Sequence, residues 1–225
     1  MKTPPPQQYI SAACEEELER HGDNFRGAGY TKSRQEAEEM YDVMLGVIRN
    51  QQTPVSLLDF GCGLAHMLDH IEKNARYQNI QYSGLDISQK FLDAAKARHP
   101  QANFIRMDVL ESAAELPEFD YLVMNGIFNY RGEISGAQMS EYWQRMISVA
   151  YKHCRQGIAF NVMSKIVDWE RDDLFHLSFD TMTNFVAANL SRHFIIHHDY
   201  RGYESTTYVY RNPYPPRDAD AEPAG

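Results

Sequence analysis

A glycine-containing turn after a short apolar run constrains the fold of this chain more than any other feature. Residues 57–65 read Leu-Leu-Asp-Phe-Gly-Cys-Gly-Leu-Ala, which predicts a buried strand that ends in an acidic residue and then turns into a helix. Two further apolar runs, 80–85 and 103–107, end at Asp86 and Asp108. Because parallel strands present their carboxyl ends at one edge of a sheet, this pattern predicts a ligand-binding crevice at that edge.

The spacing of the glycines separates two classes of nucleoside ligand. The dinucleotide fingerprint G-x-G-x-x-G would need a third glycine at position 66, where this chain has His66. Gly61, Gly63 and Ala65 instead match the spacing G-x-G-x-small. Glycines at these positions let the backbone approach a ligand closely. We therefore predict S-adenosylmethionine as the cofactor, with its methionine part against this turn.

The aspartates that follow the strands predict how this cofactor is bound. We expect Asp59 and nearby backbone groups to receive the ammonium, Asp86 to bind the ribose hydroxyls and Asp108 to accept from the adenine amine. Asp86 follows Asp59 by 27 residues (86 − 59), and a ribose-binding acid is expected about 20 residues past the glycines. Any one aspartate could simply begin a turn, but their order together with the glycines favours a cofactor site.

Composition narrows the classes of protein to which this chain can belong. The chain has 225 residues, 43% of them hydrophobic, which suits one medium-sized α/β domain. It contains no apolar stretch of roughly 18 residues, so no membrane span is predicted. Cys14, Cys62 and Cys154 lack metal-ligand or disulfide-framework spacing, so no metal site is predicted. Without a secretory signal the expected location is cytoplasmic, and the net charge of −9 argues against a nucleic-acid partner.

Strand and helix patterns alternate along the chain and predict a doubly wound α/β fold. We expect a mostly parallel, seven-stranded sheet with helices on both faces and a C-terminal antiparallel hairpin. The predicted strands are 55–60, 80–85, 102–107, 119–124, 157–163, 193–199 and 206–211. The predicted helices are 11–20, 33–50, 64–76, 88–98, 136–154 and 180–190.

Local signals set several expected boundaries. Ser33 and Glu36 form a capping-box pattern, and Asp180 is a candidate N-cap. Residues 1–9 are expected to be loose, and Arg201-Gly202-Tyr203 to join the hairpin strands. We divide the chain into an N-terminal segment 1–32 with a candidate lid, a cofactor-binding domain 33–211 and a disordered tail 212–225.

Four segments carry a resemblance to a known family. They are 57–63, 83–88, 104–109 and 120–129, and with them residues 33–211 resemble the class I S-adenosylmethionine-dependent methyltransferase superfamily. The chain is also similar to a bacterial subgroup with an N-terminal His-Gly, here His21-Gly22, and a late pattern of tyrosines. The tyrosine pattern comprises Asp199-Tyr200, Tyr208 and Tyr210.

The resemblance implies a Rossmann-like methyltransferase fold and a set of cofactor contacts. Ile87 would pack on the adenine, with Asp108 and Val109 at its edge, and Asn125 would face the ammonium or the methyl acceptor. Ala65 is a mild departure from the glycine of the family. The full expected cofactor-binding set is Asp59, Gly61, Cys62, Gly63, Asp86, Ile87, Asp108, Val109 and Asn125.

The methyl acceptor is less well defined by the sequence. Candidate catalytic residues are Asn125, His66, His198 and Tyr200. A surface position is an alternative for His66, and the alternation of a strand allows only one of His197 and His198 to face a pocket. Residues 125–128 resemble the Asn-Pro-Pro-Phe of amino-methylating DNA enzymes, but both prolines are missing.

We therefore predict methyl transfer to a hydroxyl or amine of a small molecule, such as a sugar or secondary metabolite. The alternatives are a protein or nucleic-acid methyltransferase, or a non-catalytic partner subunit that binds S-adenosylmethionine. The sequence makes no prediction of the oligomeric state.

Overall fold

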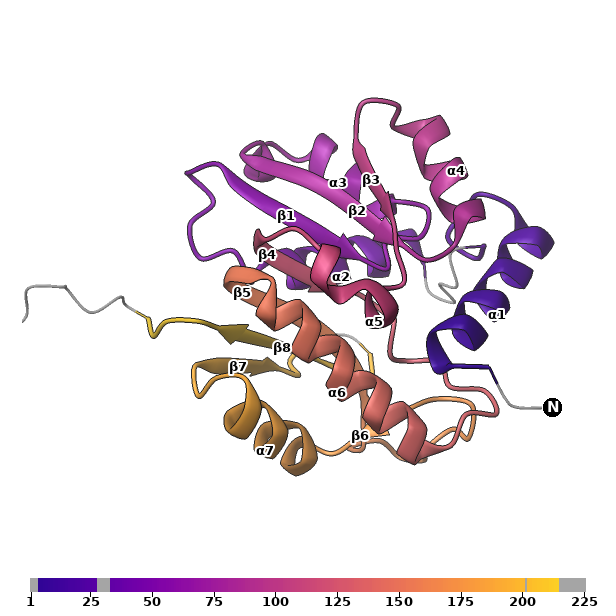
Figure 1. Ribbon diagram of the computed structural model, residues 1–225, viewed down its shortest axis with the longest axis vertical. Helices are drawn as coiled ribbons and strands as arrows, with labels where there is room; N and C mark the ends of the chain where they lie inside the picture. Colours follow the sequence, from indigo (N-terminus) through magenta and orange to yellow (C-terminus); the bar gives the residue numbers. More distant parts are fainter. Residues whose placement is uncertain (1–3, 28–32, 201, 215–225) are drawn as a thin grey trace, which may run out of the picture.

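One sheet of eight strands dominates the computed structural model, which describes residues 4–27, 33–200 and 202–214. The strand order is β3-β2-β1-β4-β5-β8-β7, with the short β6 beside β5 (Figure 1). The strands from β1 to β6 pair in parallel, whereas β8 runs antiparallel to both β5 and β7. The strands are β1 (Val55–Phe60), β2 (Ile80–Asp86), β3 (Asn103–Arg106), β4 (Phe119–Met124), β5 (Cys154–Ser164), β6 (His176–Leu177), β7 (Phe194–His197) and β8 (Glu204–Tyr210).

Helices cover both faces of the sheet, which confirms the predicted doubly wound α/β fold and its closing antiparallel hairpin. The sheet has eight strands rather than the predicted seven, because the two-residue β6 pairs with β5. Neighbouring residues of β1 point to opposite faces: Leu57 joins the core with α2 and α3, and Leu58 the core with α6. The helices are α1 (Pro6–His21), α2 (Arg34–Leu45), α3 (His66–Lys73), α4 (Gln89–Arg98), α5 (Val109–Ser112), α6 (Gly136–Lys152) and α7 (Phe179–Asn189). Short 3₁₀ turns lie at Ala75–Tyr77 and Ala113–Glu115.

The prediction that residues 1–9 are loose is wrong from Pro6 onward. Pro6 opens α1, where a proline needs no N–H partner and already has a helical φ. Ile10 is then buried in the core beneath α6. Helix α1 lies beside the carboxyl ends of the strands in Figure 1, so tertiary packing stabilises a segment whose composition alone suggests a flexible end.

Two predicted helices are shorter than their sequence pattern suggested. The capping box of Ser33 and Glu36 is confirmed, but α2 ends at Leu45, where the carbonyl of Val43 accepts from the Tyr208 hydroxyl and from the N–H of Gly46. The predicted helix 64–76 is interrupted at Asn74, whose backbone is extended and whose side chain caps the following 3₁₀ turn. In both cases a side chain forms a hydrogen bond with a backbone group that would pair within the helix if the helix were longer.

Helix α7 and the C-terminal hairpin differ in detail from the prediction. Ser178, not Asp180, caps α7, because its hydroxyl accepts from the Thr181 N–H at 3.2 Å. Asp180 lies in the first turn of the helix instead. Strand β7 is shorter than expected, and Arg201 of the predicted connection lies outside the described residues, as do residues 215–225 of the predicted tail.

Candidate functional site

A cleft of about 1070 Å³ lies at the carboxyl ends of the parallel strands. Helix α1 forms one of its walls, with Ile10 and Cys14 among the lining residues. The expected glycine turn, the carboxylates of Asp59 and Asp86 at the ends of β1 and β2, and that of Asp108 after β3 all line this cleft. Its volume is at the upper end of the range of about 300–1,000 Å³ that is typical of small-ligand sites, so it has room for more than one small ligand.

The turn after β1 has the backbone conformation that its glycines predicted. Gly61 and Gly63 have φ values of +79° and +52°, in the left-handed region. A Cβ added to Gly61 would lie 2.4 Å from Cγ2 of Ile127, so the turn cannot hold a side chain there. The N–H groups of Gly61 and Cys62 both donate to the carbonyl of Leu85, at 2.7 and 2.9 Å, and fix the turn against β2. The resulting surface is a bare backbone cradle that fits a closely approaching ligand.

Ala65, which stands where the resembling family has a third glycine, adopts a backbone conformation typical of glycine. Its φ of +56° and ψ of +33° are left-handed, and its side chain is fully buried before α3 begins. This conformation costs an ordinary residue about 1–2 kcal/mol. The departure from the family pattern therefore leaves the shape of the turn intact and adds local strain.

Asp86 connects the end of β2 to the glycine turn. One of its carboxylate oxygens accepts from the N–H of Gly63 at 2.9 Å and the other from the N–H of Ser88 at 2.8 Å. Burial raises the pKa of Asp86, and these backbone hydrogen bonds oppose the rise. The carboxylate lines the cleft beside Ile87, in the position from which an acid can bind a ribose.

Asp59 is more deeply buried than Asp86 and Asp108. The Tyr82 hydroxyl donates to its carboxylate at 2.9 Å. Burial raises the pKa of Asp59 to about 7, against the effect of the Tyr82 hydrogen bond, and nearby Asp86 adds to the rise. Burial also raises the pKa of the adjacent Cys62 thiol. A cation entering the cleft would favour the ionised form of Asp59.

Asp108 and α1 meet at the edge of the cleft next to α5. One carboxylate oxygen of Asp108 caps α5 by accepting from the N–H of Leu110 at 3.1 Å. The other accepts from Nε2 of Gln7 in α1, also at 3.1 Å. Further along α1, Glu15 accepts from the Ser88 hydroxyl at 2.6 Å. The sequence analysis missed these contacts, since no motif in residues 6–21 indicates where that helix docks.

A second cluster of polar side chains lies where β4 and β5 end and β8 begins. Asn161 of β5 is only 1% exposed. Its Nδ2 donates to Oδ1 of Asn125 at 3.1 Å and to Oε2 of Glu204 at 2.6 Å, while its Oδ1 accepts from the N–H of Gly126 at 2.7 Å. All three side chains line the cleft. Asn125 was expected here, whereas Asn161 and Glu204 were missed. A single amide in the apolar run 158–163 is the signal that could have indicated Asn161.

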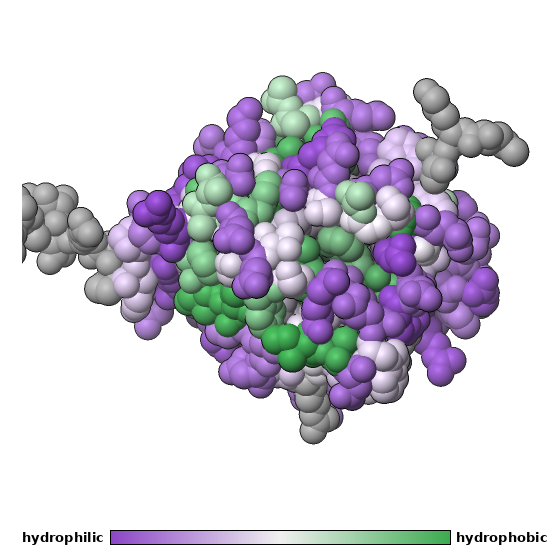
Figure 2. Space-filling view, turned by 90° about the horizontal axis from the view of Figure 1, so that it is seen from below, coloured by the Kyte–Doolittle hydropathy of each residue, from purple (hydrophilic) through white to green (hydrophobic). Residues whose placement is uncertain are grey.

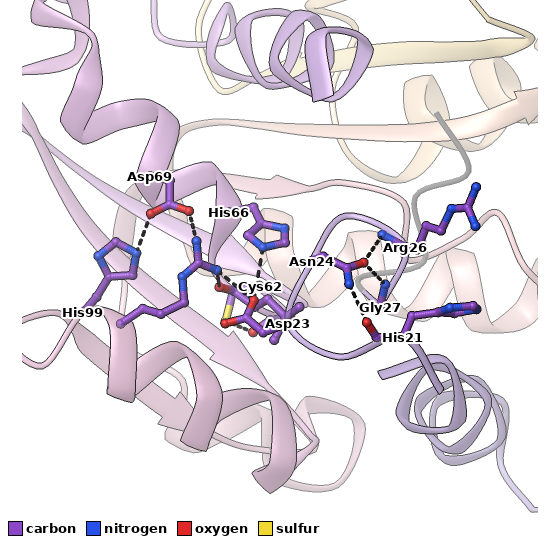
Figure 3. Close-up of polar contacts among 12 residues, drawn as sticks. His21, Asp23, Asn24, Arg26, Gly27, Cys62, His66, Asp69 and His99 are labelled. Atoms are coloured by element: carbon purple, nitrogen blue, oxygen red, sulfur yellow. Dashed lines mark hydrogen bonds and ion pairs between the residues drawn. The ribbon is translucent and has the colours of Figure 1, made fainter. Parts of the chain in front are cut away.

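His66 lies beside the cleft and is not a surface residue. Only 7% of it is exposed. Its ring lies 4.7 Å from that of Phe25, and its Nε2 lies 3.4 Å from the carboxylate of Asp23 (Figure 3). Burial, and then Arg98, lower the pKa of His66. The alternative of an exposed helix position is therefore wrong.

The same close-up shows how loop 22–27 is attached to the domain. Arg98 of α4 pairs with Asp23 at 3.2 Å and also with Asp69 of α3. Asp69 in turn lies 3.1 Å from His99 (Figure 3). This network fixes the loop that follows α1 against α3 and α4.

His198 and Tyr200, the other two catalytic candidates, are not brought to the cleft. The ring of His198 packs edge-on against Phe179 at 5.4 Å. The Tyr200 hydroxyl shares a 2.8 Å hydrogen bond with Thr206. Both residues follow β7, the outermost strand of the sheet, and neither lines the cleft. His197 stacks on Tyr208, at 4.6 Å between ring centroids.

The surface, the titratable side chains and the helices add three observations on the described residues. Seen from below, hydrophobic side chains reach the surface in separate patches among hydrophilic ones (Figure 2). Within residues 4–27, 33–200 and 202–214, no three His, Cys, Asp or Glu side chains are grouped to hold a metal ion. None of the helices described there is both long and apolar enough to cross a membrane.

Known proteins resemble this chain in sequence and in fold. Residues 58–159 match the model of a methyltransferase domain family. Rv1506c of Mycobacterium tuberculosis, a provisionally named methyltransferase, is 30% identical over 165 residues, which are 72% of this chain and 96% of that protein.

Solved structures share the fold at low sequence identity. Magnesium protoporphyrin IX methyltransferase from Synechocystis PCC 6803, with bound SAH, has a TM-score of 0.64 at 15% identity, covering 92% of this chain and 97% of that one. A SAM-dependent methyltransferase from Archaeoglobus fulgidus has a TM-score of 0.59 at 11% identity, covering 81% and 96%.

Proposed function

We infer the reaction of this cleft from one premise: the chain belongs to the class I S-adenosylmethionine-dependent methyltransferase superfamily, and S-adenosylmethionine is its cofactor. When bound, S-adenosylmethionine supplies a methyl group that its sulfonium already activates. We propose that this protein transfers the methyl group to a hydroxyl or amine of a small molecule. The observation that supports the proposal is one cleft with a bare glycine cradle at one side and the Asn125–Asn161–Glu204 group at the other.

The residues of the first half of the cleft fit the cofactor. We propose that the turn at Gly61 and Gly63 and the carboxylate of Asp59 hold the methionine part, and that Asp86 binds the ribose. Ile87 and Val109 would border the adenine, with Asp108 and Cys62 beside them. The supporting evidence is that all of these residues line the cleft and that the cradle has no room for a side chain at Gly61.

The protein's own contribution to such a reaction is positioning. A displacement at an activated carbon needs a nucleophile held in line and water kept out. Positioning can supply about 7–11 kcal/mol of the barrier. Helix α1 covers the nucleoside side through Gln7 and Glu15, so it would shield the bound cofactor from solvent.

A small acceptor fits the shape and charge of this protein better than a polymer does. The cleft is concave and is walled on one side by α1. The net charge of −9 opposes an approach to the phosphates of a nucleic acid. The sugar or secondary-metabolite nature of the acceptor remains a proposal that substrate screening can narrow.

Asp86→Ala tests the cofactor assignment. Calorimetric titration of the wild type should show binding of S-adenosylmethionine and none of NAD. The variant should bind S-adenosylmethionine more weakly by roughly 1.5–3 kcal/mol, the scale of a hydrogen bond to a charged group. Glu141→Ala removes an exposed carboxylate of α6 that does not line the cleft and should leave the affinity unchanged. Equal affinities in all three proteins would contradict the ribose role of Asp86.

Turnover is tested separately from binding. Wild-type protein incubated with S-adenosylmethionine and a metabolite extract should release S-adenosylhomocysteine. Binding without any release from extracts or from purified protein and nucleic-acid substrates would favour the alternative of a non-catalytic partner subunit.

A further inference from the structure

Large hydrophobic side chains are exposed around one end of the cleft. Among the described residues, six large hydrophobic side chains are exposed, and four of them lie in the segments that follow β4 and β5 and that precede β8. These four, which we call the apolar rim, are Tyr130, Ile166, Trp169 and Tyr203. Trp169 is 72% exposed and Tyr203 is 57% exposed, yet both line the cleft, as does Tyr130. Exposed apolar side chains gathered beside a cleft mark a place of contact with a ligand or a partner.

The loop between β5 and β6 carries two of the rim residues and is fixed at both ends by hydrogen bonds. At its start, the Ile166 N–H donates to the Ser164 hydroxyl at 2.9 Å. At its end, the Phe175 N–H donates to the carbonyl of Asn129 at 2.8 Å. The Ser164 N–H donates to the carbonyl of Tyr203 at 2.8 Å and ties a third rim residue to the same loop. The rim side chains are therefore exposed on a fixed backbone, which limits the cost of ordering them when a ligand binds.

Three polar side chains that line this end of the cleft are engaged in shaping the loop. His176 uses both ring nitrogens: Nδ1 donates to the carbonyl of Ser164 at 2.7 Å, and Nε2 accepts from the Arg171 N–H at 3.2 Å. The Arg171 guanidinium makes two hydrogen bonds to the carboxylate of Asp173, at 2.9 and 2.5 Å. All three residues line the cleft, but their hydrogen bonds to one another and to the backbone make them poor partners for the hydroxyls of a sugar.

The charge of the same loop argues against an anionic occupant of the rim. Carboxylates outnumber basic side chains in residues 165–173, which contain Asp168, Glu170, Asp172 and Asp173 but only Lys165 and Arg171. Both basic side chains pair within the loop, Lys165 with Glu170 at 3.3 Å and Arg171 with Asp173. Segments that bind anionic membrane surfaces are rich in Lys and Arg instead. The rim therefore suits an uncharged apolar body better than it suits an anionic ligand or a membrane.

We propose that the apolar rim is the acceptor-recognition site of the cleft and that the acceptor has an uncharged, ring-bearing apolar body. Trp169 and Tyr203 pack on this body at the mouth of the cleft. This inference rests on the proposed methyltransferase function and narrows its small-molecule acceptor to apolar ring compounds, in place of a free sugar. The rim is continuous with the cleft, since three of its four side chains line it, and this continuity assigns it to the acceptor rather than to a second copy of the chain.

The two tryptophans of the chain provide a direct binding assay. Trp169 belongs to the rim and Trp143 is fully buried in the core, so their indole N–H signals in an NMR spectrum report on the rim and on the core. Trp169→Phe assigns the two signals. Protein saturated with S-adenosylhomocysteine is titrated with 2-naphthol, 2-naphthoate and myo-inositol. The first probe has two uncharged fused rings, the second carries a carboxylate on the same rings, and the third is an uncharged ring covered with hydroxyls.

2-Naphthol should shift the Trp169 signal in a saturable way and leave the Trp143 signal in place. It should bind at least about tenfold more tightly than either other probe, a ratio that corresponds to about 1.4 kcal/mol. Tyr203→Ala should weaken the binding of 2-naphthol at least about threefold, since aromatic contacts contribute beyond their buried area. Ile195→Ala removes an exposed hydrophobic side chain of β7 that does not line the cleft and should leave this affinity unchanged.

Several results would overturn the inference. These are equal binding of the three probes, tighter binding of myo-inositol or 2-naphthoate, no shift of the Trp169 signal, or an unchanged affinity in folded Tyr203→Ala. A Trp169 signal that moves with protein concentration in the absence of any probe would assign the rim to a second copy of the chain instead. Calorimetric titration with S-adenosylhomocysteine is performed on every protein in parallel. Absence of that binding in the wild type would contradict the proposed function, whereas binding without a preference for 2-naphthol would contradict only this inference. Thermal unfolding checks that each variant is folded.

Discussion

At the scale of single residues, the cleft depends on backbone conformations that side chains resist. Gly61 and Gly63 take left-handed values that glycine accepts freely, but Ala65 takes a similar value with a buried methyl group. The same turn therefore combines two unstrained positions with one strained position. Ala65 connects the cradle directly to the first turn of α3.

Ala65→Gly should raise the free energy of unfolding by up to about 1 kcal/mol. Relief of the left-handed backbone contributes about 1–2 kcal/mol, and the lost burial of one methyl group subtracts about 0.8 kcal/mol. Urea denaturation of the variant and the wild type measures the difference.

Ala95→Gly is the matched control for this prediction. Ala95 is equally buried but lies inside α4, where glycine costs about 1 kcal/mol of helix propensity. That variant should be less stable than the wild type. Destabilisation of similar size in both variants would show that Ala65 is not strained.

At the scale of secondary-structure elements, the strands at the centre of the sheet could be predicted closely from the sequence. The bounds of β1 and β4 agree with the predicted runs 55–60 and 119–124, because buried parallel strands are continuous apolar segments bounded by turns. The helix ends at Leu45 and Asn74 could not be predicted, since they depend on contacts that form only in the folded chain.

The residues of the candidate site also fall into a set that the sequence predicted and a set that it did not. The carboxylates at the ends of β1 and β2 and just after β3 were predictable, since each comes at the end of an apolar run. Glu204 and the residues of α1 were not, because they reach the cleft through strand order and helix docking rather than through a local motif. His198 and Tyr200 were proposed for the site from their place at the end of the predicted strand 193–199, and Tyr200 also from the tyrosine pattern of the resembling subgroup, but neither lines the cleft.

Helix α1 gives a prediction at this scale. Glu15→Ala removes the acceptor of the Ser88 hydroxyl and a partner of Lys90 at 3.1 Å. We expect faster amide hydrogen exchange in residues 6–21, because the helix loses a contact that holds it over the cleft. Glu16→Ala, an exposed position on the same helix, should leave the exchange rates close to those of the wild type. Unchanged exchange in Glu15→Ala would mean that Ile10 and Gln7 suffice to dock α1.

At the scale of the whole molecule, the cleft makes folding stability depend on pH. The pKa of Asp59 is raised by burial to about 7 in the folded protein, whereas an unfolded aspartate titrates near 3.9. Between these values the folded protein retains a proton that the unfolded chain releases. The stability associated with this group is therefore present at low pH and is lost as the pH rises toward about 7.

Asp59→Asn should remove the loss of folding stability that accompanies the rise in pH. The free energy of unfolding of the variant relative to the wild type should increase between about pH 4 and about pH 7 and then stay constant. Denaturant titrations of both proteins across this range measure the difference, which cancels the titration of groups that do not interact with Asp59. A difference that is independent of pH would show that Asp59 ionises normally in the folded protein. Binding of S-adenosylmethionine should be weaker in the variant, because the amide lacks the charge for the ammonium.

The docking of α1 has a consequence for where the protein can be shortened. Gln7 and Glu15 hold this helix to groups that follow β3 and β2. The first segment of the chain therefore forms a wall of the cleft whose floor comes from the strands. A truncated polypeptide starting at residue 33 would retain every strand of the sheet, yet its cleft would lack the wall that α1 forms and would be open to bulk water on that side.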